Sequence, residues 1–228
     1  MQKRIVRKLD LEILLSHVKP HPSPRPDLEQ YTIPANVAAT MLYIAAYMND
    51  DIVNKRVLDL GCGTGRLALG AAFLGAKDVV GLDVDRVAVN VASENSIQLD
   101  LEDKVQWVAG SLDVIRGSFD TVIQNPPYGI QTRQADRKFL EKALETGHAV
   151  YSLHKSVYDD EAFLGKLKTT SEGVLPVEPS PFLKSYVETH GGKVKAVYAL
   201  IMTVPRMFAF HTRKRHEFVV DLYVLKGR

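Results

Sequence analysis

Four residues, Asn125-Pro126-Pro127-Tyr128, follow a short apolar run of the kind that forms a buried strand. They suit the chemistry of a planar NH2 group whose lone pair is delocalised into a base or an amide. The side-chain oxygen of Asn125 and the backbone carbonyl of Pro126 can each accept one N–H, while proline removes competing donors. The ring of Tyr128 offers a stacking face, worth roughly 1–3 kcal/mol per base. The motif predicts methyl transfer to a conjugated amine; the alternative is a proline-stiffened turn.

A glycine-rich loop lies upstream, after the apolar residues 57–60. Its glycines, Gly61, Gly63 and Gly65, allow the backbone to approach a nucleotide-like ligand closely. A dinucleotide-binding loop needs a glycine or alanine where this chain has Arg66, so the spacing argues against NAD. We expect a strand, a ligand loop and a helix, in that order.

Three acids stand where the polar groups of such a ligand need acceptors. Asp59 can hold an ammonium group, and Asp83, which ends the next predicted strand, can accept the hydrogens of a ribose diol. Asp113 follows a third strand and could accept from an adenine amine. An amino-acid tail, a ribose and an adenine together indicate S-adenosylmethionine (SAM). Taken singly, the alternatives are a loop cap for Asp59, a helix-starting acid for Asp83 and a solvated turn acid for Asp113.

The composition limits what the chain can form. Its 228 residues fit a single domain, with an N-terminal extension at 1–50, a SAM-binding core at 51–155 and an insert, helix and hairpin at 156–228. The formal charge of +2 is too small to indicate nucleic-acid binding by itself. Its one cysteine, Cys62, allows no internal disulfide and no cysteine-based zinc site, and no metal is expected. No run approaches roughly 18 apolar residues, so we expect a soluble, cytoplasmic protein.

Apolar periodicity, with proline and glycine at the boundaries, predicts alternating strands and helices over residues 57–153 and therefore a mostly parallel sheet. Residues 194–204 and 218–225 predict an antiparallel pair. The proline-rich residues 21–26 should form an exposed linker, and residues 158–181 are either a lid or a surface insert. The remaining strands are expected at 57–60, 79–83, 105–108 and 119–124, and helices at 9–18, 34–48, 87–99, 137–146 and 182–189.

Two basic clusters are candidates for RNA contact. One follows the Asn125 motif, and the other lies in the turn of the C-terminal pair beside Phe208 and Phe210. Lysine and arginine neutralise phosphates and make RNA binding salt-sensitive, although a charge run is usually a solvated turn. The candidates are Arg133, Arg137, Lys138, Arg206, His211, Arg213, Lys214, Arg215 and His216.

The order of these motifs resembles class I SAM-dependent methyltransferases. The whole chain resembles the methyltransferase-like 5 family, which makes N6-methyladenosine in small-subunit ribosomal RNA. The resemblance is carried by Leu28-Glu29-Gln30-Tyr31, residues 59–65, Ser111-Leu112-Asp113-Val114, residues 125–129, residues 149–156 and Phe210-His211.

This resemblance implies a Rossmann-like α/β fold: a seven-stranded, mostly parallel sheet with a C-terminal antiparallel hairpin and helices on both faces. It implies that Gln30, Tyr31 and Thr32 close over SAM, and that residues 125–128 hold an adenine. Asp59, Gly61, Asp83 and Asp113 would bind the cofactor. Eukaryotic members have phenylalanine at the position of Tyr128. The ring of Tyr128 still provides a stacking face.

The resemblance also implies a partner, a small zinc-binding activator that adds a strand to an exposed edge of the sheet. That edge would be residues 105–108, because an uncovered apolar edge strand favours association. Alternatively, the side chain of Trp107 faces the core.

Three other functions remain open. A protein glutamine methyltransferase needs the same acceptors for its planar amide, but members of that class carry a larger N-terminal domain. The second is a DNA adenine methyltransferase, but enzymes of that class usually have a separate target-recognition domain, and none is visible in this sequence. The third is a non-catalytic SAM-binding ribosome-assembly factor, against which the intact residues 125–128 argue.

Overall fold

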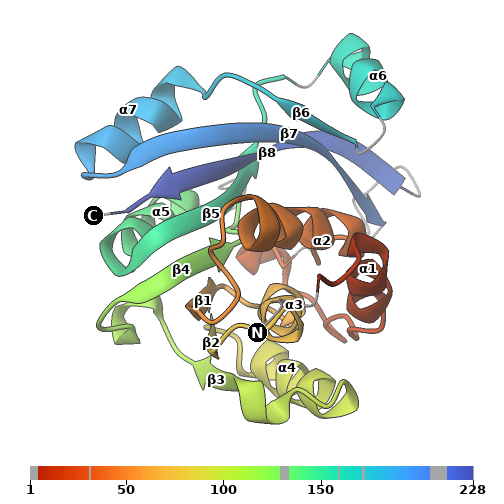
Figure 1. Cartoon of the computed structure of the whole chain (residues 1–228), viewed down its shortest axis with the longest axis vertical. Coiled ribbons are helices and arrows are strands. Elements are labelled where there is room, and N and C mark those ends of the chain that lie inside the picture. Colours follow the sequence, from red (N-terminus) through yellow and green to blue (C-terminus); the bar gives the residue numbers. More distant parts are fainter. Residues whose placement is uncertain are drawn as a thin grey trace.

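The computed structural model describes residues 5–30, 32–128, 134–158, 160–170, 173–205 and 215–227. Within these ranges eight strands form one sheet in the order β3-β2-β1-β4-β5-β8-β7-β6 (Figure 1). The strands are β1 (Arg56–Leu60), β2 (Asp78–Asp83), β3 (Val105–Ala109), β4 (Phe119–Gln124), β5 (Gly147–Lys155), β6 (Val174–Pro176), β7 (Lys193–Pro205) and β8 (Arg215–Lys226).

The sheet confirms the predicted α/β class. Strands β1 to β5 are parallel, and β8 runs antiparallel to both β5 and β7. The expected number of seven strands is wrong, because β6 pairs with β7 as an eighth. Strand β6 lies within residues 158–181, and its three residues are too few to show an alternating pattern in the sequence.

The predicted helices are confirmed to within a few residues. The helices are α1 (Lys8–Ser16), α2 (Ala35–Tyr43), α3 (Arg66–Phe73), α4 (Arg86–Gln98), α5 (Ala135–Thr146), α6 (Glu161–Thr169) and α7 (Pro181–Thr189), with short turns η1 (Pro26–Leu28), η3 (Glu102–Lys104) and η4 (Leu112–Val114). A π-helical turn, η2 (Ile44–Met48), continues α2 directly. Helix α6 was not predicted; it packs through Leu167 onto Ala199 and Val219.

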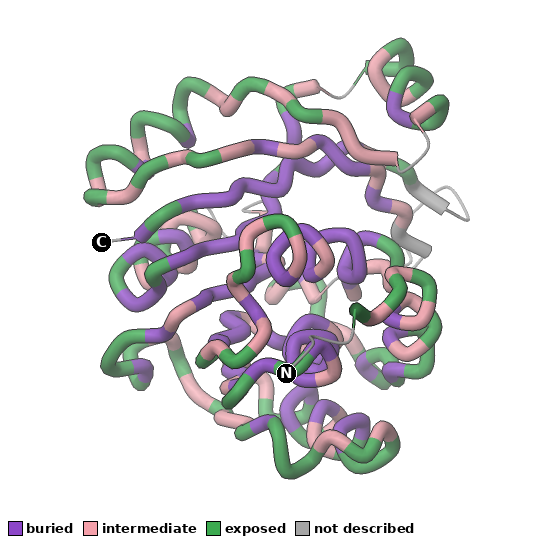
Figure 2. Tube along the Cα trace, in the orientation of Figure 1, coloured by how far each residue is buried: buried purple, intermediate pink, exposed green. Residues whose placement is uncertain are grey.

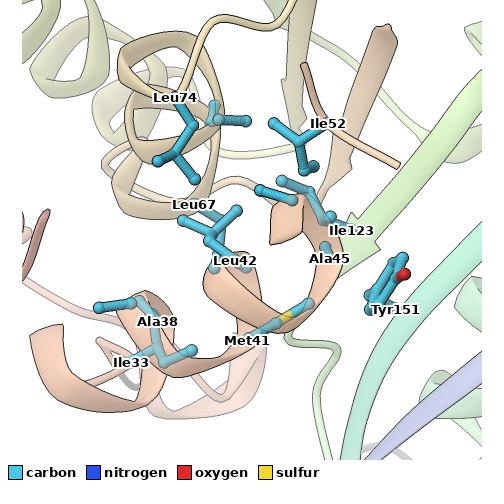
Figure 3. Close-up of a cluster of buried hydrophobic side chains, with 14 of the residues drawn as sticks. Ile33, Ala38, Met41, Leu42, Ala45, Ile52, Leu67, Leu74, Ile123 and Tyr151 are labelled. Atoms are coloured by element: carbon cyan, nitrogen blue, oxygen red, sulfur yellow. The ribbon is translucent and has the colours of Figure 1, made fainter. Parts of the chain in front are cut away.

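Helices cover both faces of the sheet (Figure 1). On one face α1, α2 and α3 share a core with the strands, and Figure 3 shows Met41 and Leu42 of α2 within it. A Cβ at Gly70 of α3 would lie 2.4 Å from Leu42, so the glycine permits this close helix contact. On the other face α5 and α7 pack Leu144 and Val187 onto the sheet. Both faces of the central strands are therefore buried (Figure 2).

The edge strand β3 carries Trp107, whose side chain turns inward. A Cβ at Gly81 would lie 2.4 Å from the indole, and one at Gly65 would lie 2.5 Å away. The indole N–H donates to Ser96 Oγ at 3.2 Å. Of the two alternatives for Trp107, the structure shows the one in which the ring packs against the protein.

In the part of the chain that the structure describes, no helix combines the length and apolar character needed to cross a membrane.

Candidate active site

A cavity of about 340 Å³ opens where β1, β2 and β4 end. Leu60 is in register with both Leu82 of β2 and Gln124 of β4, so the residues that follow these strands gather at one edge. Ligands of open parallel sheets bind at this edge. The polar and glycine residues lining the cavity include His21, Glu29, Gln30, Thr32, Asp59, Gly61, Gly63, Arg66, Asp83, Ser111 and Asn125.

The glycine loop forms one wall of the cavity. Gly61, Gly63 and Gly65 have φ values of 71°, 53° and 90°, which residues with a side chain rarely adopt. Gly61 and Gly63 line the cavity, and a Cβ at Gly63 would meet no atom within 4 Å. Gly65 instead lies beneath the indole of Trp107. Two of the three glycines thus present bare backbone to a ligand, and the third leaves space for the indole of Trp107.

Asp59 is a buried carboxylate with one unused oxygen. Its Oδ2 accepts the N–H of Ala68 at 2.9 Å, whereas Oδ1 has no hydrogen-bond partner among the described residues. Burial raises the pKa of this carboxyl to about 8. A cation placed at Oδ1 would stabilise the ionised form, so the site fits the ammonium group of SAM.

Asp83 organises the loop from the end of β2. Its Oδ2 accepts the N–H of Gly63 at 2.8 Å, and its Oδ1 accepts the N–H of Asp85 at 2.9 Å. Burial raises the pKa of Asp83. Each carboxylate oxygen retains capacity for a second hydrogen bond, as a ribose diol requires.

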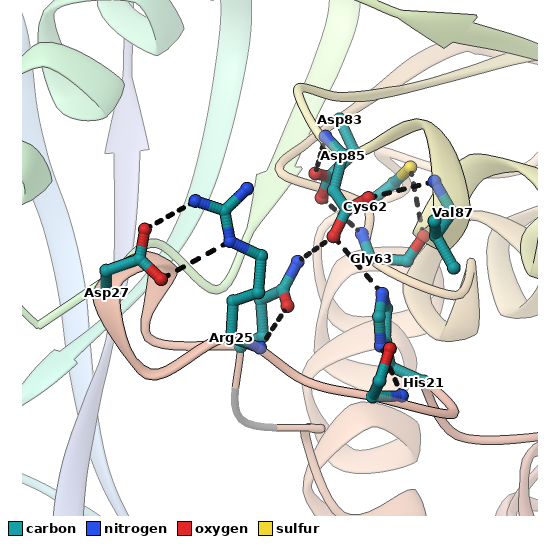
Figure 4. Close-up of polar contacts among 10 residues, drawn as sticks. His21, Arg25, Asp27, Cys62, Gly63, Asp83, Asp85 and Val87 are labelled. Atoms are coloured by element: carbon teal, nitrogen blue, oxygen red, sulfur yellow. Dashed lines mark hydrogen bonds and ion pairs between the residues drawn. The ribbon is translucent and has the colours of Figure 1, made fainter.

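Residues 18–30, here called the N-terminal strap, contribute His21 and residues 27–30 to the cavity lining, and polar contacts join the strap to Asp85 (Figure 4). Gln30 Nε2 donates to Asp85 Oδ2 at 2.7 Å. The backbone N–H of Ser23 donates to His21 Nδ1, so Nε2 carries the proton that is shared with Asp85 Oδ2 over 3.2 Å. The expectation of an exposed linker at residues 21–26 is wrong for His21, which is buried.

Arg66 holds the first residue of the strap and a residue just after its end. Its Nη1 donates to the carbonyl of Ile33 at 2.5 Å, and its Nη2 donates to the carbonyl of Val18 at 3.1 Å. Asn95 supports the same region, since its side chain bonds to both backbone groups of Lys19. The first residue of α3 therefore fixes the cover of the cavity.

Asn125 comes directly after β4 and lines the cavity together with Pro127. The Tyr128 hydroxyl donates to Asn125 Oδ1 at 3.0 Å, and the Tyr128 ring meets Phe218 of β8 nearly at right angles, 6.0 Å between centroids. The Tyr128 N–H donates to Glu29 Oε2 at 2.7 Å. Residues 125–128, the acceptor loop, thus touch both the strap and the C-terminal hairpin.

Comparisons with known proteins agree with this geometry. The family model described as "Ribosomal protein L11 methyltransferase (PrmA)" matches residues 37–126, which contain the glycine loop and the strand-end acids. The Drosophila melanogaster rRNA N(6)-adenosine-methyltransferase Mettl5 is 39% identical over 93% of this chain and 93% of its own length. The Danio rerio METTL5 is 33% identical over 93% and 95%. The chain belongs to the METTL5 family.

A solved structure of a candidate RNA methyltransferase from Pyrococcus horikoshii is 34% identical, with a TM-score of 0.80 over 98% of this chain and 99% of that one. The METTL5-family chain is therefore a methyltransferase with a class I fold, and SAM is its methyl donor.

The structure brings eight of the thirteen predicted catalytic and cofactor-binding residues of this METTL5-family chain to one cavity: Gln30, Thr32, Asp59, Gly61, Gly63, Asp83, Asn125 and Pro127. Gly65, Pro126, Tyr128 and Asp113 are not among the described residues that line it, and Asp113 is exposed. Arg137 lies over the ring of Phe182 at 4.9 Å, and the neighbouring Lys138 is exposed. Outside the described residues lie Tyr31, Gly129, Arg133, Arg206, Phe208, Phe210, His211, Arg213 and Lys214, and the side chains of Arg215 and His216 are also undescribed.

The sequence-based prediction assigned no role in the METTL5-family site to four residues that shape it: His21, Glu29, Arg66 and Asn95. Each acts through a partner between 33 and 99 residues away, which local patterns do not reveal. The one available signal was Arg66 in place of the usual small residue, because a large cation there must find acceptors.

Proposed function

We propose that this chain transfers a methyl group from SAM to the exocyclic N6 of an adenosine in ribosomal RNA, in the small subunit. The observation that carries this proposal is the position of Asn125. It lines the same cavity as Asp59 and Asp83, so an amine held by Asn125 would face the cofactor's end of that cavity. The names of the METTL5 relatives from Danio rerio and Drosophila melanogaster describe them as rRNA N(6)-adenosine methyltransferases.

The cofactor would be held by three parts of the chain. Asp59 Oδ1 receives its ammonium group, Asp83 its ribose, and the bare backbone of Gly61 and Gly63 lies along it. We assign Gln30, Thr32 and Tyr31 to the cover, with Gln30 anchored on Asp85. When bound, SAM would supply a methyl group activated by its sulfonium sulfur, and S-adenosylhomocysteine, a thioether, is the leaving group.

The acceptor loop would prepare the amine. Asn125 Oδ1 and the Pro126 carbonyl each accept one N–H, which draws the lone pair out of conjugation and aims it at the methyl carbon. As the N–C bond forms, the nitrogen becomes positive, and these two oxygen dipoles stabilise that charge until the extra proton leaves to water. No dedicated base is required for this step.

Tyr128 would position both Asn125 and the base. A carboxamide oxygen has two lone pairs, so Asn125 Oδ1 can accept from the Tyr128 hydroxyl and from the target amine together. Phe218 fixes the plane of the Tyr128 ring beside Asn125. We assign stacking of the adenine to that ring. Asp113, by the same proposal, approaches the cofactor's adenine from the exposed turn η4.

The RNA would lie across the mouth of the cavity. Helix α5 begins soon after the acceptor loop, and its first turns carry Arg137 and Lys138. We assign these residues, together with Arg133, Arg206, His211, Arg213, Lys214 and Arg215, to phosphate contacts. Bringing the adenosine to Asn125 requires it to leave its stack, which favours a loosely structured target.

We further propose that a small zinc-binding activator pairs with β3. This strand ends the sheet order, and its backbone edge has no neighbouring strand among the described residues. Exposed Val84 and Val114 lie near its carboxyl end and add apolar surface. Val114→Asp should weaken the complex at least tenfold in a titration with the activator, whereas Val157→Asp, an exposed valine after β5, should leave its affinity unchanged. Equal affinities for both variants would contradict the proposed edge.

The test of the function is transfer from labelled SAM to small-subunit ribosomal RNA, with and without the activator, followed by nucleoside mass spectrometry. Label in N6-methyladenosine at one site supports the proposal. Label in a release-factor glutamine instead would favour the protein-methyltransferase alternative. Transfer to neither, with RNA binding retained, would favour a non-catalytic assembly factor.

A further inference from the structure

A hydrogen bond joins the strap to the acceptor loop. Glu29 Oε2 accepts the backbone N–H of Tyr128 at 2.7 Å, between residues 99 positions apart. Glu29 is 6% exposed and lines the same cavity as Asn125. A hydrogen bond to a charged, buried acceptor is stronger than one between neutral groups. This contact therefore joins the cover of the cofactor site to the loop that holds the target amine.

Glu29 has an uncommon backbone conformation at the point where it makes this contact. Its φ of 49° and ψ of 43° lie in the left-handed region, and its N–H closes the turn η1 by donating to Pro26 O at 2.9 Å. A glutamate keeps that conformation only where its surroundings hold it. After this turn the adjacent side chains take different partners: Glu29 bonds to Tyr128, and Gln30 bonds to Asp85.

Tyr128 links the strap to Asn125, the proposed acceptor of the target amine. Its hydroxyl donates to Asn125 Oδ1, and it also lies 3.4 Å from Met202 Sδ of β7. Fixing the Tyr128 backbone therefore fixes the hydroxyl that orients the Asn125 side chain. If the strap moves, the hydrogen-bond acceptor for the target amine moves with it.

We propose that Glu29 is a positioning residue that couples closure of the strap over the cofactor to the placement of the acceptor loop. This inference rests on the proposed function, because it assumes that the acceptor loop binds a planar amine. It implies an order of events: the cofactor closes the strap, Glu29 fixes Tyr128, and the target amine then finds Asn125 correctly oriented.

The first test needs no RNA: hydrogen exchange of the Tyr128 amide, with and without S-adenosylhomocysteine. In Glu29→Ala this amide should exchange about 10- to 100-fold faster than in the wild type, and the added protection by the ligand should disappear. Glu29→Gln keeps a neutral acceptor oxygen, so its exchange should be about 3- to 10-fold faster. Ser23→Ala, an exposed change on the same strap, should exchange like the wild type. Should Glu29→Ala lose its native Trp107 fluorescence, Glu29→Gln carries the test.

The second test is kinetic. At saturating SAM, kcat should fall at least tenfold in Glu29→Ala and recover most of that loss in Glu29→Gln, while the KM for RNA changes less than about threefold. Wild-type exchange at Tyr128 in both variants, or a loss confined to SAM affinity, would overturn the coupling. A wild-type protein that methylates no RNA would instead contradict the proposed function, and the exchange experiment would still decide the role of Glu29.

Discussion

The Tyr128 hydroxyl donates to Asn125 Oδ1 over 3.0 Å, so the last residue of the acceptor loop orients the first. Burial raises the pKa of the Tyr128 hydroxyl, which keeps it protonated and able to donate. Tyr128→Phe deletes this bond and retains the ring. One neutral hydrogen bond contributes about 0.5–1.5 kcal/mol, so kcat should fall about 3- to 10-fold with the Kd for SAM unchanged. Tyr43→Phe, on α2, is the control; a wild-type kcat in Tyr128→Phe would show that the hydroxyl orients nothing needed for transfer.

The carboxyl of Asp59 should make SAM binding depend on pH. Its pKa of about 8 in the free protein must fall when an ammonium group arrives, so binding below pH 8 releases a proton. The Kd for SAM should therefore decrease by up to about tenfold per pH unit from pH 6 to 8. Calorimetry in buffers of different ionisation enthalpy measures the proton directly. Asp59→Asn should bind weakly and without this pH dependence; an unchanged proton release would place the titration elsewhere.

The same pKa affects stability without ligand. The folded value of about 8 exceeds the unfolded value of about 3.9, so the folded state binds more protons between these limits. The contribution of Asp59 to the free energy of unfolding should therefore fall as pH rises from 4 to 8. Asp59→Asn should reduce that slope in urea denaturation, and a slope identical to the wild type would contradict the assignment.

The glycine at position 81 should be required by the indole of Trp107. A Cβ there would lie 2.4 Å from the ring, so Gly81→Ala should destabilise the fold by about 1–3 kcal/mol. Gly165→Ala in α6 is the matched control, because its Cβ would meet nothing within 4 Å and alanine favours a helix. Fluorescence of the single tryptophan during urea unfolding reports both variants. Equal stability of the two alanine variants would mean that Trp107 does not pack in this slot.

The sequence was sufficient for the parts of the fold that repeat locally. The four predicted parallel strands and their terminal acids, Asp59 and Asp83, follow from apolar runs and spacing, and the cavity forms where those strands end. The contacts of the strap did not follow, because Glu29 and Arg66 find their partners only after the chain folds back. Strand β6 was missed for a different reason: pairing with β7, and not its own three residues, makes it a strand.

Arg66 should control how long the cofactor stays bound. It bridges the carbonyl of Val18, which begins the strap, and the carbonyl of Ile33, just after the strap, and burial lowers the pKa of Arg66 to about 10, so it remains charged. Arg66→Lys keeps the charge but cannot span both carbonyls, and dissociation of SAM should become about tenfold faster. Arg56→Lys, at the amino end of β1, is the control. Stopped-flow measurement of the dissociation rate checks this, and equal rates would show that the strap does not depend on Arg66.

The account depends most on the side chain of Asn125 as an acceptor for the target amine. Methyl transfer by Asn125→Ala to small-subunit ribosomal RNA, at saturating SAM and with RNA affinity measured in parallel, tests it directly. We predict a fall in kcat of at least about 1000-fold with RNA and SAM affinities within threefold, and partial activity in Asn125→Asp, which keeps an acceptor oxygen. Transfer by Asn125→Ala at the wild-type rate would contradict the mechanism.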